Sequence, residues 1–149
     1  MLYFEDIHLN REHKSSEYVI GKDEIIAFAK QWDPQPYHID EEEAKKWPLG
    51  LTASSIHSYA ICSKLANAMI GEPTAAVAGL GVDEMRMPVP VRPGDRLHAV
   101  SFIDSKRDSK SKPDMGIVTS VTKLINQKGE VVLSYKTSSL IYKKPVSNS

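Results

Sequence analysis

The chain has 149 residues, the usual length of one domain, and we expect a single domain over residues 1–149. Its 19 basic and 19 acidic residues give a formal net charge of zero, so it lacks the basic excess that a nucleic-acid-binding surface needs. One cysteine excludes an intramolecular disulfide, and neither a signal-peptide pattern nor a membrane-spanning apolar run is present, so we expect a cytoplasmic protein with no membrane partner.

The N-terminal part predicts short elements that lead to a proline-rich segment. Residues 1–10 predict a short strand or an arm, and residues 17–20 predict a short strand. Residues 22–32 predict a helix, because apolar side chains recur at helical spacing and acids occupy the first turn. Pro34 cannot continue this helix, so we expect the helix to deliver Asp33 at its C-terminal end.

The proline-rich segment reads Asp-Pro-Gln-Pro-Tyr-His-Ile-Asp over residues 33–40. Its two prolines fix two φ angles and remove two backbone donors, which predicts a stiff loop rather than a helix or a central strand. Asp33 and His38 stand five residues apart, and a carboxylate and an imidazole that converge can hold a water molecule and exchange a proton with it. Spacing alone leaves open a turn aspartate and a surface histidine. Asp40 precedes Glu43 by three residues, as in a capping box, so we assign it to the start of a second short helix.

Residues 52–70 predict the longest helix. Of these 19 residues, 11 are apolar and Lys64 alone carries a formal charge, which is typical of a helix buried on nearly all sides. Gly71 and Pro73 end it. Cys62 lies within this run and is expected to be a buried, inert thiol. A buried helix followed by strands predicts an α+β domain in which a sheet wraps around the helix.

The second half of the chain is strand-like. The clearest strands are residues 117–125 and 131–142, rich in β-branched side chains and joined by a hairpin at 126–129. Residues 85–93 contain three prolines, which favours an edge or bulged segment. The remaining segments are expected to be strands at 75–80 and 97–103, a mobile loop at 105–114 and a tail at 143–149.

The segment at 33–40 resembles the Asp-x-Asn-Pro-x-His-x-Asp motif of the MaoC-like dehydratases, the (R)-specific enoyl-CoA hydratase group. Residues 52–58, 81–86, 90–95 and 126–132 resemble further parts of that family in the same order. The resemblance implies a hot-dog fold, in which an antiparallel sheet wraps around a central helix, and a homodimer. It also implies an acyl-CoA substrate, with no cofactor, that gains or loses water between a trans-2-enoyl-CoA and an (R)-3-hydroxyacyl-CoA.

The resemblance also implies roles for individual residues. Asp33 is expected to bind and activate the water, with His38 as its acid or base partner. The backbone N–H of Ser55 takes the place of a family glycine in an oxyanion hole, which a helix N-terminus suits. Gln35 replaces the family asparagine, and Ser63 matches a serine that the family places near the catalytic pair.

Weaker candidates and rival functions stay open at this point. His57 can line the pocket or be held by a neighbouring carbonyl. Arg86 and Arg92 can meet the CoA phosphates or serve as solvated residues. No HExxH motif or histidine cluster predicts a metal site. The alternatives to a hydratase are a hot-dog acyl-CoA thioesterase and a non-catalytic acyl-CoA-binding subunit, and neither acyl length nor pathway is fixed by the sequence.

Overall fold

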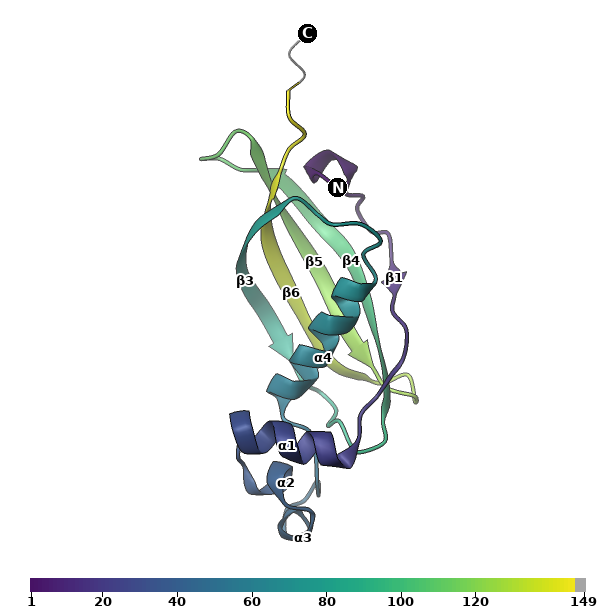
Figure 1. Ribbon diagram of the computed structural model, residues 1–149. Helices are drawn as coiled ribbons and strands as arrows, with labels where there is room; N and C mark the ends of the chain where they lie inside the picture. Colours follow the sequence, from purple (N-terminus) through teal and green to yellow (C-terminus); the bar gives the residue numbers. More distant parts are fainter. Residues whose placement is uncertain (147–149) are drawn as a thin grey trace.

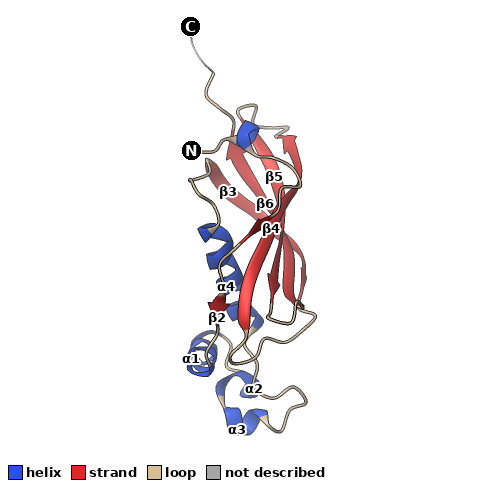
Figure 2. Ribbon diagram, turned by 90° about the vertical axis from the view of Figure 1, so that its right-hand side faces the viewer, coloured by secondary structure: helices blue, strands red, loops and turns tan. Residues whose placement is uncertain are grey.

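A long helix lies along one face of a curved antiparallel sheet, and three short helices gather at the end where this helix begins (Figures 1 and 2). The computed structural model describes residues 1–146. The helices are η1 (Phe4–Asp6), α1 (Lys22–Trp32), α2 (Pro36–Ile39), α3 (Glu41–Ala44) and α4 (Ser55–Ala68). The strands are β1 (His13–Lys14), β2 (Tyr18–Val19), β3 (Ala76–Arg86), β4 (Arg96–Asp108), β5 (Met115–Ile125) and β6 (Val131–Tyr142).

The sheet has the strand order β1-β4-β5-β6-β3, and every pairing is antiparallel. The predicted hairpin joins β5 to β6: Gly129 adopts φ 76°, and the side chain of Asn126 accepts hydrogen bonds from the N–H groups of Lys128 and Glu130. We call the face of the sheet that α4 covers the inner face. The expected sheet wrapped around one helix is confirmed.

The helix α4 is shorter and less buried than the sequence predicts. It begins at Ser55 rather than at residue 52, because the buried hydroxyl of Ser54 accepts a hydrogen bond from the N–H of Ile56 and caps the helix. One side of α4 packs into the core with Ile61 and Leu65, whereas Ile56 on the opposite side is 54% exposed. The sheet of one chain covers only one side of the helix.

The proline-rich segment is partly helical, which corrects the expectation of a loop. Pro36 opens α2 at the first helical position, where its missing N–H and fixed φ cost nothing. Asp40 then caps α3 as predicted, its Oδ1 accepting from the N–H of Glu43 at 3.0 Å. The predicted bounds of α1 are confirmed at both ends.

The edge strand β3 replaces the two strand segments expected at 75–80 and 85–93. It is one strand with three register shifts, and Glu84 near its end adopts φ 53°, so the predicted bulging falls within this strand and the prolines follow it. Nearly all of β3 is exposed. No helix within residues 1–146 is both long and apolar enough to cross a bilayer.

Candidate active site

Two neighbouring helices bring Asp33 and His38 together. Asp33 follows the last residue of α1, where its N–H donates to the carbonyl oxygen of Ala29 at 2.8 Å, and His38 lies in α2. The Oδ2 atom of Asp33 and the Nε2 atom of His38 are 3.8 Å apart. This distance is too long for a direct hydrogen bond, but one water molecule can bond to both atoms at once.

A backbone carbonyl fixes the proton on His38. The Nδ1 atom of the buried ring lies 2.5 Å from the carbonyl oxygen of Thr52. A carbonyl oxygen only accepts, so Nδ1 carries a hydrogen, and in the neutral form of the ring the unprotonated nitrogen is Nε2, on the side of Asp33. The edge of the ring also packs against Tyr37, with 4.5 Å between the ring centroids. His38 is therefore held in the tautomer that can accept a proton from the direction of Asp33.

Ser54 connects the catalytic pair to the start of α4, and the sequence analysis missed it. Its Oγ donates a hydrogen bond to Oδ2 of Asp33 at 2.7 Å while accepting from the N–H of Ile56 at 3.2 Å. The side chain is fully buried. A serine directly before an apolar helix is a capping signal, and an earlier predicted start at residue 52 concealed it.

Ser55 occupies the helix N-terminus that the oxyanion prediction requires. As the first residue of α4, its N–H has no acceptor within the helix, and the helix dipole adds partial positive charge there. Its φ is not in the left-handed region, so serine in place of glycine causes no backbone strain. Ser55 borders a cleft of about 310 Å³ together with Thr52, Ser58 and Val132. The backbone N–H of Ser55 therefore directly follows, along the chain, the residue whose hydroxyl binds Asp33.

Neither Gln35 nor Ser63 makes a side-chain hydrogen bond to the pair within residues 1–146. Gln35 is exposed, and its backbone rather than its side chain is used: its carbonyl oxygen accepts from the N–H of His38 at 2.9 Å. Ser63 lies two turns along α4 from Ser55 and borders a second, larger cavity.

His57 faces α1 and not the cleft. Its ring stacks on Phe28 with 4.3 Å between centroids and 9° between planes, and its Nε2 lies 3.5 Å from Oε2 of Glu24. The expectation that a neighbouring carbonyl holds His57 is therefore wrong, because the polar neighbour of its ring is the carboxylate of Glu24. Burial lowers the pKa of His57, and within residues 1–146 its Nδ1 has no hydrogen-bond partner. His57 packs α1, which ends at Asp33, against α4.

The two arginines proposed for CoA phosphates are exposed and outside the cleft lining. The guanidinium of Arg86 donates to the carbonyl oxygen of Met85, and that of Arg92 donates to the carbonyl oxygen of Leu49. Both have further N–H groups available, so the CoA assignment stays a prediction.

Comparison with known families decides the relationship of the chain. The model of the MaoC-like domain family matches residues 8–125. The chain belongs to the MaoC-like domain family. The match includes the Asp33–His38 segment, both helices that carry the pair, and α4.

Individual relatives agree with this membership. The uncharacterized protein YdeM of Bacillus subtilis is 31% identical over 140 residues, which cover 92% of this chain and 96% of YdeM. The crystal structure of the MaoC-like dehydratase from Rhodospirillum rubrum is 35% identical with a TM-score of 0.89, covering 98% of this chain and all of that one. An R-hydratase of Pseudomonas aeruginosa shares the fold at 19% identity with a TM-score of 0.76, covering 99% of this chain and 97% of that one.

Proposed function

We propose that this protein adds water reversibly across the double bond of a trans-2-enoyl-CoA to give an (R)-3-hydroxyacyl-CoA. The observation that supports this most is the convergence of Asp33 Oδ2 and His38 Nε2 at 3.8 Å, beside the N-terminus of α4. Membership of a family with hot-dog dehydratases and hydratases agrees with this chemistry. The reaction needs only water and the thioester, and no cofactor takes part.

The pair can carry one proton from the water to C2 on the same face of the substrate that the water attacks. Asp33 accepts a hydrogen bond from the water and makes its oxygen more nucleophilic. As that oxygen bonds to C3, the unprotonated Nε2 of His38 takes the proton that the O–H bond releases. The resulting imidazolium gives a proton to C2, which completes a syn addition and restores the neutral ring.

The N-terminus of α4 is suited to the charge that develops on the thioester. Attack at C3 places negative charge on the thioester oxygen as an enolate. The free N–H of Ser55, aided by the helix dipole, can donate to that oxygen. Because Ser54 binds Asp33 and Ser55 follows it directly, the water-activating group and the oxyanion donor are fixed to the same helix start.

A spectrophotometric assay with crotonyl-CoA distinguishes the three candidate functions. A hydratase removes the absorbance of the conjugated double bond and releases no free thiol. Released thiol with the double bond intact would identify a thioesterase. Tight binding without either change would identify an acyl-CoA-binding subunit.

We also propose that the active unit is a homodimer that forms at the β3 edge. All of β3 except Met85 is exposed, and Val77, Leu80 and Val82 are 43%, 53% and 41% exposed. An exposed apolar edge strand is a template for pairing with another strand, and pairing with a second copy satisfies its free N–H and C=O groups. Light scattering should give a mass of two chains, and Leu80→Glu should give one.

A further inference from the structure

A band of hydroxyl groups crosses the middle of the inner face of the sheet. The strand register pairs Ser101 with Thr122, and Thr122 with Tyr135, in one row, and Ser120 with Thr137 in the next. Ser139 follows, paired with Val118. Paired residues of antiparallel strands point to the same side of the sheet. We call these the hydroxyl band: Ser101, Ser120, Thr122, Tyr135, Thr137 and Ser139.

This band interrupts an otherwise apolar face. Toward the start of α4 the same face carries the fully buried Leu97, Leu124 and Leu133. Toward the other end it carries Val118 and Ile141, which pack with Phe4 of the N-terminal arm in a second core cluster. The hydroxyl band lies between the two clusters: Tyr135 belongs to the first of them, and Ser139 lies in the same row as Val118 of the second.

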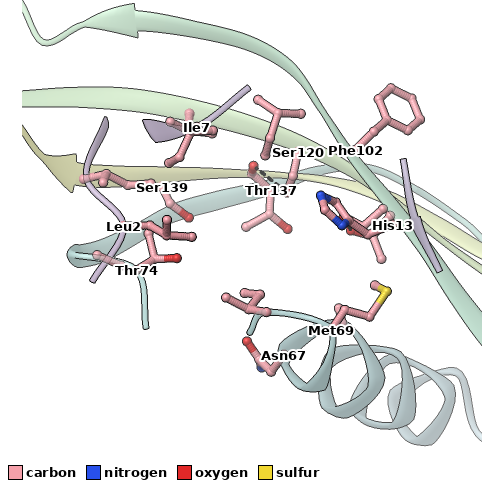
Figure 3. A pocket seen from close by; sticks show the side chains of 18 of the residues that line it. Leu2, Ile7, His13, Asn67, Met69, Thr74, Phe102, Ser120, Thr137 and Ser139 are labelled. Atoms are coloured by element: carbon pink, nitrogen blue, oxygen red, sulfur yellow. Dashed lines mark hydrogen bonds between the residues drawn. The ribbon is translucent and has the colours of Figure 1, made fainter. Parts of the chain in front are cut away.

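A cavity of about 1290 Å³ lies over the band (Figure 3). The sheet contributes Thr137 and Ser139 on one side, and Asn67 and Met69 at the end of α4 lie on the other. Within residues 1–146 no hydrogen bond is made by the hydroxyls of Ser63, Thr137 and Ser139. The cavity therefore offers unused hydrogen-bonding groups from both the helix and the sheet.

In the described part of the chain, some of the ionisable side chains that border the cavity are paired with an opposite charge, and others are not. Three carboxylates border the cavity: Asp6 is paired with Lys144 at 2.7 Å, Glu72 is paired with the N-terminal ammonium at 2.7 Å, and Glu5 accepts a hydrogen bond from the backbone N–H of Lys144 at 3.0 Å. Arg11 and His13 also border the cavity, and no carboxylate of the described residues lies within 4.0 Å of either. His13 is paired with Ser101 in the register, so it extends the hydroxyl band by one strand. The N–H groups of Arg11 and His13, which no carboxylate of residues 1–146 engages, favour a ligand group with negative or partly negative oxygen atoms.

One flank of α4 connects the cavity with the proposed catalytic site. Ser55, Tyr59 and Ser63 are four residues apart and so share one side of the helix. Tyr59 lies about 6 Å and Ser63 about 12 Å along the helix axis from Ser55. Ser55 borders the smaller cleft, and Tyr59 and Ser63 border the cavity. The rings of Tyr59 and Tyr135, both in the cavity lining, pack at 4.9 Å between centroids and join this flank of α4 to the sheet.

Resting on the proposed hydratase function, we propose that the acyl chain of the substrate passes the Tyr59–Tyr135 pair and ends in this cavity. The hydroxyl band then selects an acyl group whose far end bears oxygen, and a terminal carboxylate can accept hydrogen bonds from the guanidinium of Arg11 and the ring N–H of His13. An acyl group with a plain alkyl end leaves the free hydroxyls unpaired, so the cavity contributes less binding free energy to it. The substrate class is therefore an enoyl thioester with an oxygen-bearing terminus.

The test compares two eight-carbon substrates, trans-2-octenedioyl-CoA and trans-2-octenoyl-CoA, which differ in the terminal carboxylate. We expect a higher kcat/KM for the dicarboxylic substrate, and Thr137→Val should lower its kcat/KM roughly tenfold, the scale of one lost hydrogen bond to a charged group. Crotonyl-CoA is too short to pass the tyrosine pair, so its turnover should not change in this variant. Equal kcat/KM values for the two eight-carbon substrates would overturn the inference.

Thr119→Val is the matched control. Thr119 lies on β5 with its hydroxyl 3.0 Å from that of Ser138, on the face opposite to Ser120, and outside the cavity lining. The control should keep the wild-type preference. An equal loss in both variants would refute a role for the cavity, because it would show a general effect on the sheet.

Calorimetric binding of the saturated analogues octanedioyl-CoA and octanoyl-CoA separates this inference from the function it rests on. Tighter binding of the dicarboxylic analogue, reduced by Thr137→Val, supports the cavity even if no hydration is seen, in which case the proposed function alone fails. Hydration of crotonyl-CoA with equal binding of the two analogues would overturn the cavity proposal and leave the function standing.

Discussion

Replacement of Ser54 by alanine removes one oxygen atom that makes two hydrogen bonds. The Oγ of Ser54 caps α4 and donates to Asp33 at 2.7 Å, and the side chain is completely buried. Loss of a serine cap costs about 1 kcal/mol of stability. Loss of a hydrogen bond to a charged group costs about 1.5–3 kcal/mol, which corresponds to a factor of roughly ten or more if the bond serves the transition state. We expect Ser54→Ala to lower both the unfolding free energy and kcat.

Asp40→Ala provides a matched comparison. Asp40 caps α3 through Glu43, and within residues 1–146 its side chain makes no hydrogen bond to Asp33 or His38. We expect a stability loss of about 1 kcal/mol from the lost cap and an unchanged kcat. Ser54→Thr keeps a hydroxyl at position 54 and should recover most of the activity. Urea unfolding and enoyl-CoA hydration kinetics measure both effects. If Ser54→Ala retained the kcat of Asp40→Ala, the Ser54–Asp33 bond would have no functional role.

Three further predictions concern buried side chains. Burial lowers the pKa of His57, so the unfolded chain takes up a proton first as the pH falls through about 6.5. Unfolding free energy should therefore fall between pH 7.5 and 5.5, and fall less in His57→Gln; an identical slope in both would contradict this. Burial raises the pKa of Cys62 to about 11. A thiol reagent at pH 8 should therefore label Cys62 slowly in the folded protein and quickly in the protein unfolded by guanidinium. Fast labelling of the folded protein would contradict this, because it would show that the thiol is accessible. Leu133→Ala should lower the unfolding free energy in urea by about 2–5 kcal/mol, because Leu133 is fully buried. Leu9→Ala, at a side chain that is 48% exposed, should lower it by less than about 0.5 kcal/mol. Equal losses in the two variants would refute the core described here.

The sequence predicted elements whose ends are set by local chemistry. Pro34 stops α1 whatever the rest of the chain does, and the Asp40–Glu43 spacing makes a cap from neighbouring atoms alone. The hairpin between β5 and β6 follows from the turn at Gly129. These features need no knowledge of distant contacts. The approach of Asp33 to His38 was expected from their separation in sequence and the family motif, and the structure places them 3.8 Å apart.

Other features depend on contacts across the fold. The start of α4 was predicted too early, because small residues at 52–54 continue the helical pattern and only the Ser54 bonds to Asp33 and Ile56 mark the boundary. The neighbours of His57 could not be predicted, because the sequence does not show which side of α4 packs against α1. The hydroxyl band was hidden because serine and threonine are ordinary strand residues, and only the register puts them on one face.

The central claim is that Asp33 and His38 together carry out hydration. The most direct measurement is the loss of enoyl absorbance with crotonyl-CoA for the wild type, Asp33→Asn and His38→Ala, with the configuration of the product determined. We predict an (R)-3-hydroxy product in the wild type and a fall in kcat of roughly a hundredfold or more in each variant, the scale of losing an acid or base. Wild-type rates in both variants would contradict the account.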